Sequence, residues 1–85
     1  MSNKNLLDKI KELIPSLPNR DIQLGYDFLN KRDFESLKDL IDSAIYKVEK
    51  NIKSNTPKEE YTKVNLDELI ELKLEVSVYL NQLYY

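Results

Sequence analysis

Residues 33–52 decide the fold, and they read DFESLKDLIDSAIYKVEKNI. Apolar side chains recur here at steps of three and four residues, the spacing that places them on one face of an α-helix. Asp33 precedes the stripe as an N-cap, and lysines follow its acidic first half, so both ends suit the helix dipole. The sequence therefore predicts a helix about 30 Å long. Its apolar stripe consists of Phe34, Leu37, Leu40, Ile41, Ala44, Ile45, Val48 and Ile52.

Three further helices are predicted on either side of this one, at about 3–14, 19–31 and 65–83, with one long polar loop at 53–64. Residues 72–80 largely alternate apolar and polar side chains, which is a strand pattern. Helix is still favoured there, because no other segment offers a strand to pair with. We expect a single domain with an all-α fold, a small three- to four-helix bundle.

The expected helices carry signals at their ends. Asn19 is the expected N-cap of the second helix, and Asn65 with Glu68 three residues later resembles a capping box at the start of the last. Pro15 ends the first helix. Gly25 lies inside the second helix at a cost of about 1 kcal/mol relative to Ala, so it marks either a close helix crossing or a tolerated weak spot.

The helix faces predict the core. It should contain Leu6, Leu7, Ile10, Leu13, Ile14, Ile22, Leu29, Phe34, Leu37, Ile41, Ala44, Val48, Leu69, Leu72, Val76, Leu80 and Leu83.

Composition removes most catalytic chemistry. The 85 residues include no Cys, no His and a single Gly, so thiolate and imidazole catalysis, zinc modules and glycine-rich phosphate loops are excluded. Asp39 and Asp42 are paired carboxylates, but on a polar helix face both would stay hydrated and ionised. We therefore expect a protein that is not an enzyme and holds no cofactor and no metal.

The charge pattern narrows the choice of partners. The net charge is −2 with mixed signs, and no basic face is evident, so we expect no nucleic-acid partner. No apolar run approaches the roughly 20 residues that span a bilayer, and the N-terminus lacks the apolar region of a signal peptide. We expect no membrane association and a cytoplasmic location.

The last helix carries more apolar surface than one face needs. One face comprises Leu69, Leu72, Val76, Tyr79, Leu80 and Leu83, and a second stripe comprises Leu66, Ile70, Leu74 and Val78. A helix with two apolar stripes is either central in its own bundle or shared with another chain. The chain ends on Tyr84 and Tyr85, which favour the second alternative because aromatic residues are enriched in interfaces.

An acidic line is expected along the outward face of the 33–52 helix. It comprises Glu35, Asp39, Asp42, Tyr46 and Glu49. Such a line is a solvated face supported by neighbouring lysines, a contact for a basic protein with Tyr46 as its anchor, or a weak cation site.

Three segments resemble small uncharacterised proteins of AT-rich bacteriophages of gut bacteria. They are Leu17-Pro18-Asn19-Arg20-Asp21, Lys31-Arg32-Asp33-Phe34-Glu35-Ser36-Leu37 and Lys58-Glu59-Glu60-Tyr61. The resemblance covers most of the chain and carries no active-site residues. It implies a virion component or a phage accessory protein, in the host cell cytoplasm or in the virion.

Two functions remain as expectations. The first is a non-enzymatic protein–protein interaction or assembly protein that binds a protein partner or forms a homo-oligomer through its last helix. The alternative is a small regulator that inhibits or sequesters a host protein through the acidic face.

Overall fold

The computed structural model describes residues 3–83, with side chains from residue 6 onward, and the regular secondary structure in that range is helical. The α-helices are α1 (Asn3–Leu13), α2 (Asn19–Asn30), α3 (Phe34–Ile52), α4 (Glu59–Thr62) and α5 (Leu66–Leu83), and a 3-10 turn, η1 (Ile14–Ser16), follows α1. The expected all-α bundle is confirmed, and the four long helices begin and end within one or two residues of the predicted bounds.

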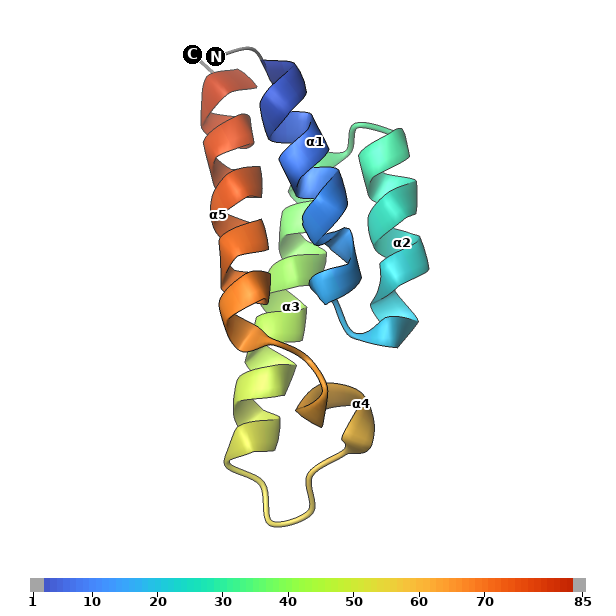
Figure 1. Ribbon diagram of the computed structural model, residues 1–85, viewed down its shortest axis with the longest axis vertical. Coiled ribbons are helices and arrows are strands. Elements are labelled where there is room, and N and C mark those ends of the chain that lie inside the picture. Colours follow the sequence, from blue (N-terminus) through green and yellow to red (C-terminus); the bar gives the residue numbers. More distant parts are fainter. Residues whose placement is uncertain (1–2, 84–85) are drawn as a thin grey trace.

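The four long helices form an elongated bundle of 44 × 20 × 18 Å. α5 packs along α1 on one side and α3 on the other, while α2 packs against α3 and η1 (Figure 1). The start of α1 and the end of α5 lie at the same end of the bundle. At the opposite end α3 continues past the start of α5 and is covered there by α4.

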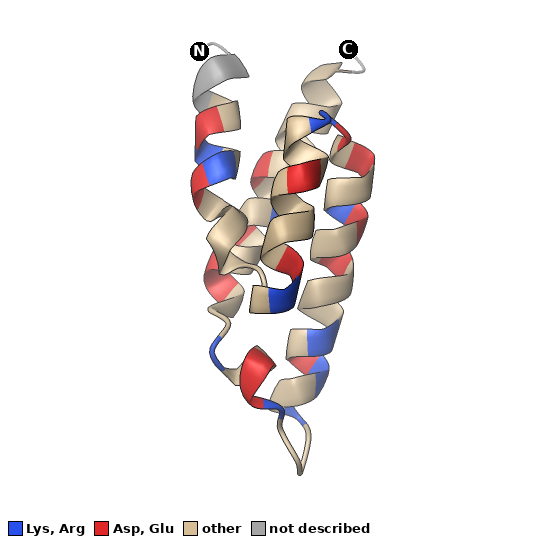
Figure 2. Cartoon of the chain, turned by 90° about the vertical axis from the view of Figure 1, so that its right-hand side faces the viewer, with Lys and Arg blue, Asp and Glu red and all other residues tan. Residues whose placement is uncertain are grey.

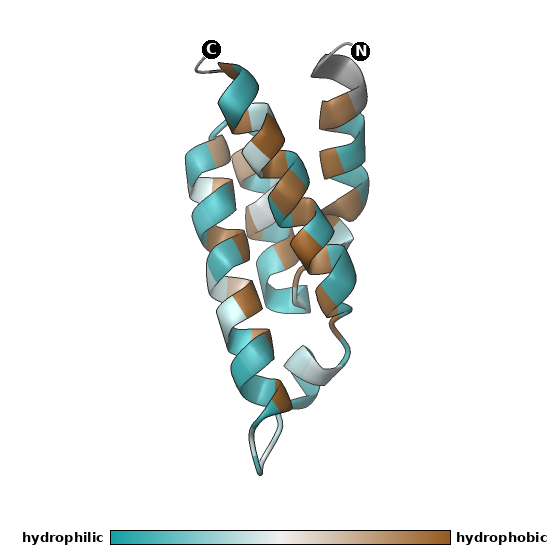
Figure 3. Ribbon diagram, turned by 90° about the vertical axis from the view of Figure 1, so that its left-hand side faces the viewer, coloured by the Kyte–Doolittle hydropathy of each residue, from teal (hydrophilic) through white to brown (hydrophobic). Residues whose placement is uncertain are grey.

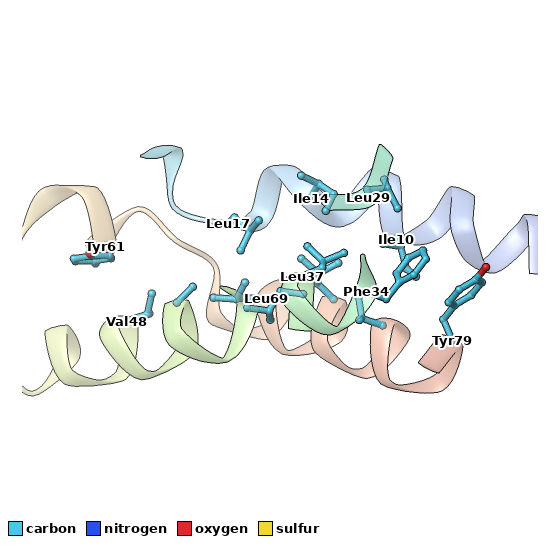
Figure 4. Close-up of a cluster of buried hydrophobic side chains, with 14 residues drawn as sticks. Ile10, Ile14, Leu17, Leu29, Phe34, Leu37, Val48, Tyr61, Leu69 and Tyr79 are labelled. Carbon is cyan, nitrogen blue, oxygen red and sulfur yellow. The ribbon is translucent and has the colours of Figure 1, made fainter. Parts of the chain in front are cut away.

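One cluster of buried apolar side chains joins these helices (Figure 4). At one end of the cluster the rings of Phe34 and Tyr79 lie 4.3 Å apart between centroids, and at the other end Tyr61 of α4 is buried near Val48. The expected core residues that are buried are Ile10, Ile14, Leu29, Phe34, Leu37, Ile41, Ala44, Val48, Leu69, Leu72 and Val76. Those partly buried at its edge are Leu6, Leu7, Leu13, Ile22 and Leu80.

Two expected core or stripe positions are wrong. Leu83 and Ile52 are both exposed. Each lies on the apolar side of its helix, but each is the last residue of that helix, at an end of the bundle. Periodicity identified the correct face and could not show where the neighbouring helices stop.

The helix caps follow the sequence at two of three positions. Asp33 Oδ1 accepts a hydrogen bond from Ser36 N at 3.2 Å, and Asn65 Oδ1 accepts one from Glu68 N at 3.2 Å. The prediction for Asn19 is wrong, because α2 begins at Asn19 and its side chain makes no capping hydrogen bond. The carbonyl of Pro18 instead accepts from Asp21 N at 2.8 Å.

Gly25 marks a close approach, although its neighbour is the segment around η1. A Cβ atom at Gly25 would lie 2.7 Å from Leu17 Cδ1 and 3.2 Å from Ile14 Cγ2. Both of these side chains are buried. The absence of a side chain at Gly25 therefore lets α2 pack against the turn that follows α1.

The segment 53–64 is not only a loop, because α4 forms one turn of helix within it. The side-chain amide of Asn51, in the last turn of α3, holds the backbone of this segment at Lys58. Its Oδ1 accepts from Lys58 N at 2.7 Å, and its Nδ2 donates to Lys58 O at 3.3 Å. These two bonds satisfy the buried amide and hold the chain where it enters α4.

Candidate interaction surface

α5 has two faces with different surroundings. Its inner face is buried against α1 and α3 through Leu69, Leu72, Val76 and Tyr79. Its opposite side carries three exposed apolar side chains, Ile70 (38% exposed), Leu74 (58%) and Val78 (46%). Steps of four residues place them along one line, and we call this line the outer stripe.

The outer stripe lies on the side of α5 that faces away from the rest of the bundle. Figure 3 faces this side and shows α5 in front, with α1 and α3 set back on either side of it and apolar residues along its length. Ordinary surface helices carry one apolar face, and that face is buried. The outer stripe is therefore the apolar surface that the fold leaves over.

Ion pairs flank the outer stripe on the side of α1. Lys9 Nζ lies 3.3 Å from a carboxylate oxygen of Glu75 and 3.6 Å from one of Glu71. Its hydrogen bond to Glu75, with the charges of both carboxylates, raises the pKa of Lys9. The lysine thus offsets two negative charges beside the stripe and ties α5 to α1.

The charges on the flank of α5 toward α3 are also offset by ion pairs. Lys73 Nζ lies 3.1 Å from Asp42 Oδ1, and Lys38 Nζ lies 3.7 Å from Asp42 Oδ2. Asp42 Oδ1 is buried and accepts no hydrogen bond of regular geometry, so its contact with Lys73 is an ion pair. Both flanks of α5 are therefore held by pairs within the chain.

The sequence placed Leu66, Tyr84 and Tyr85 at this surface as well. Leu66, in the first turn of α5, is partly buried and packs against the core, because it lies at the edge of the inner face of that helix. It is therefore not part of the outer stripe. Tyr84 and Tyr85 lie outside the described residues, and Leu83 is exposed at the end of the helix.

The acidic line of α3 is partly occupied by contacts within the chain. Asp42 belongs to the ion pairs with Lys38 and Lys73, and so it does not face outward as expected. Tyr46 is 58% exposed, and Lys50 Nζ lies 5.1 Å from the centroid of its ring. Asp39 is exposed. Glu35 and Glu49 are exposed as well, so the acidic line keeps Tyr46 and three exposed carboxylates and is interrupted at Asp42.

The hollows on the surface differ in their lining, which is mostly polar in some and mostly apolar in others. One of about 440 Å³ lies between η1, α4 and the start of α5 and is lined in part by Glu59, Glu60 and Glu68. Glu59 pairs with Lys63 at 3.0 Å and Glu60 with Arg20 at 3.6 Å. All three glutamates are exposed, so this hollow lacks the desolvated carboxylate that acid–base catalysis requires.

Lysine and arginine residues are spread over several helices and alternate with acidic residues (Figure 2). Among the described side chains, no three acidic residues lie close enough together to hold a metal ion. None of the helices between residues 3 and 83 combines the length and the hydrophobicity needed to cross a bilayer.

Sequence reasoning missed Asn51 and Tyr61, which lie where α4 meets α3. A single Asn in the last turn of a helix gives no signal of burial, because Asn is most often exposed. Tyr61 gave a weak signal as the one aromatic side chain in a polar segment.

Comparisons of the chain with family models, curated proteins and solved structures found no match.

Proposed function

We propose that this chain is a non-enzymatic protein–protein interaction or assembly protein that associates through the outer stripe of α5. The observation that supports it is the exposure of Ile70, Leu74 and Val78 on a helix whose other face is already buried in the core. Burial of each half-exposed side chain by a partner would contribute roughly 1 kcal/mol. The resemblance to phage proteins makes a virion or accessory component the setting that we propose.

The alternative, capture of a basic host protein by the acidic line of α3, has less support. Asp42 is already paired within the chain, and Lys50 lies over the ring of Tyr46. A basic partner would have to displace Lys50 from the aromatic anchor before binding to it.

The test of the proposed function is affinity capture with a matched pair of variants. The bait is purified from cells that make the chain naturally, as wild type, Leu74→Glu and Leu24→Glu. Leu24 is the control, because it is 43% exposed but lies on α2, away from the outer stripe. We expect wild type and Leu24→Glu to retain the same partner or additional copies of the chain, and Leu74→Glu to lose them. Equal retention by all three, or no complex with any from a chain that also stays monomeric at about 1 mM, would refute the proposal.

A further inference from the structure

We propose that the occupant of the outer stripe is a second copy of this chain, whose α5 runs antiparallel to the first around a two-fold axis at Leu74. This inference rests on the proposed function and names the partner of the same surface. It is carried by the order of side chains along the stripe and by the charges at its ends.

The outer side of α5 has a spacing that is symmetric about Leu74. The line begins at Asp67, passes through the outer stripe and ends at Asn81, in steps of three, four, four and three residues. Antiparallel pairing brings Leu74 against its own copy and Ile70 against Val78. The three apolar residues of each copy then form the centre of the contact, and polar residues form both rims, as in other interfaces.

The charges on this side select the antiparallel orientation. In a parallel pair Asp67 would face its own copy, and like charges opposite one another destabilise the contact. In the antiparallel pair Asp67 faces Asn81, whose amide can donate a hydrogen bond to the carboxylate. Glu71 lies on the flank of the stripe toward α1, where Lys9 of the same copy offsets its charge.

The remaining charged groups beside the contact are already neutralised. Glu75 is held by Lys9, and Lys73 by Asp42, within each copy. A second α5 therefore approaches a surface whose centre is apolar and whose flanks are paired. A basic partner helix would gain little there, because Asp67 and Glu71 lie only toward one end.

The contact is a single helix ridge, so the dimer is weak. Stable interfaces bury about 800 Å² on each partner, and one helix face of this length covers less. The dissociation constant should lie between about 10 µM and 1 mM.

The first experiment is sedimentation equilibrium of the purified wild-type chain up to about 1 mM. The inference predicts a monomer–dimer equilibrium that Leu74→Glu abolishes and Leu24→Glu leaves unchanged. A wild-type chain that stays monomeric overturns it. If capture experiments then still show a partner that depends on Leu74, the inference fails while the proposed function stands. If they show none, both fail.

The second experiment tests orientation with Asn81→Lys. In the antiparallel pair the introduced lysine would face Asp67 of the other copy, and two symmetric surface ion pairs tighten the dimer roughly fivefold at low salt. In a parallel pair the introduced lysines of the two copies would face each other, and the dimer would weaken, which overturns the orientation.

The tighter dimerisation of Asn81→Lys must also depend on Asp67. Positions 67 and 81 are about 21 Å apart along one helix, so their side chains interact only across the contact. The double variant Asn81→Lys with Asp67→Asn should therefore lose the fivefold gain. A gain that persists without Asp67 arises within the subunit, for example with Asp39 or Glu35 near Asn81, and contradicts the antiparallel arrangement.

Discussion

At the scale of single residues, Gly25 shows how one missing side chain sets the packing of two segments. Helix propensity favours Ala there by about 1 kcal/mol. The added methyl group, however, would meet Leu17 Cδ1 at 2.7 Å and Ile14 Cγ2 at 3.2 Å. Overpacking of a buried site typically costs about 1–3 kcal/mol, and Ile14 is stiff at χ1.

We therefore expect Gly25→Ala to lower the free energy of unfolding by about 1 kcal/mol. Urea denaturation of the variant and of wild type measures the difference. An increase in stability would mean that Leu17 rotates away freely and that Gly25 is only a weak spot in α2.

Sequence reasoning also reaches its limit at single residues. The sequence marked Gly25 but not its neighbour, because the turn at η1 is far enough away in the chain that no periodicity relates them. It gave no sign that Asn51 is buried and bonded to the backbone of Lys58. Such a contact depends on the path of the 53–58 segment, which only the folded chain defines.

At the scale of helices, the caps provide a matched comparison. Asn65 Oδ1 accepts from Glu68 N, whereas the side chain of Asn19 caps nothing. We expect Asn65→Ala to cost about 1 kcal/mol of stability and Asn19→Ala to be neutral within about 0.5 kcal/mol. Thermal unfolding of the two variants checks this. Equal losses would show that Asn19 caps α2 in solution, as the sequence pattern indicates.

The two faces of α5 provide a second comparison. Leu72 is fully buried and Leu74 is more than half exposed, two positions away on the same helix. At concentrations where the chain is monomeric, Leu72→Ala should cost about 2–5 kcal/mol and Leu74→Ala no more than about 0.5 kcal/mol. Urea unfolding curves measure both. A large loss at Leu74 would place the outer stripe in the core.

Helices were the part of the fold that could be predicted best. Four amphipathic segments with clear breaks set the number and approximate ends of the long helices, since side-chain spacing alone determines which face is apolar. Spacing revealed the second stripe on α5 but not whether it was buried. That depended on α1 and α3, which flank α5 and bury its inner face but leave its opposite side exposed.

At the scale of the whole molecule, the arrangement leaves α5 with one free side. α1 and α3 flank it, α2 packs against α3 and η1, and α4 covers the end of α3. No described element packs over Ile70, Leu74 and Val78, which stay exposed. Between residues 6 and 83 the side chains thus form one core and leave the outer stripe of α5 uncovered, and we propose that the chain associates through this stripe.

Sedimentation velocity tests this association most directly, with each fluorescently labelled chain mixed with the same unlabelled chain at about 1 mM in extract of the cells that make it. At that concentration the method detects both self-association and a foreign partner. Wild type and Leu24→Glu should sediment faster than a monomer of 10.1 kDa, and Leu74→Glu should return to the monomer rate with an unchanged helical spectrum. Monomeric sedimentation of wild type, or faster sedimentation that Leu74→Glu leaves unchanged, would contradict it.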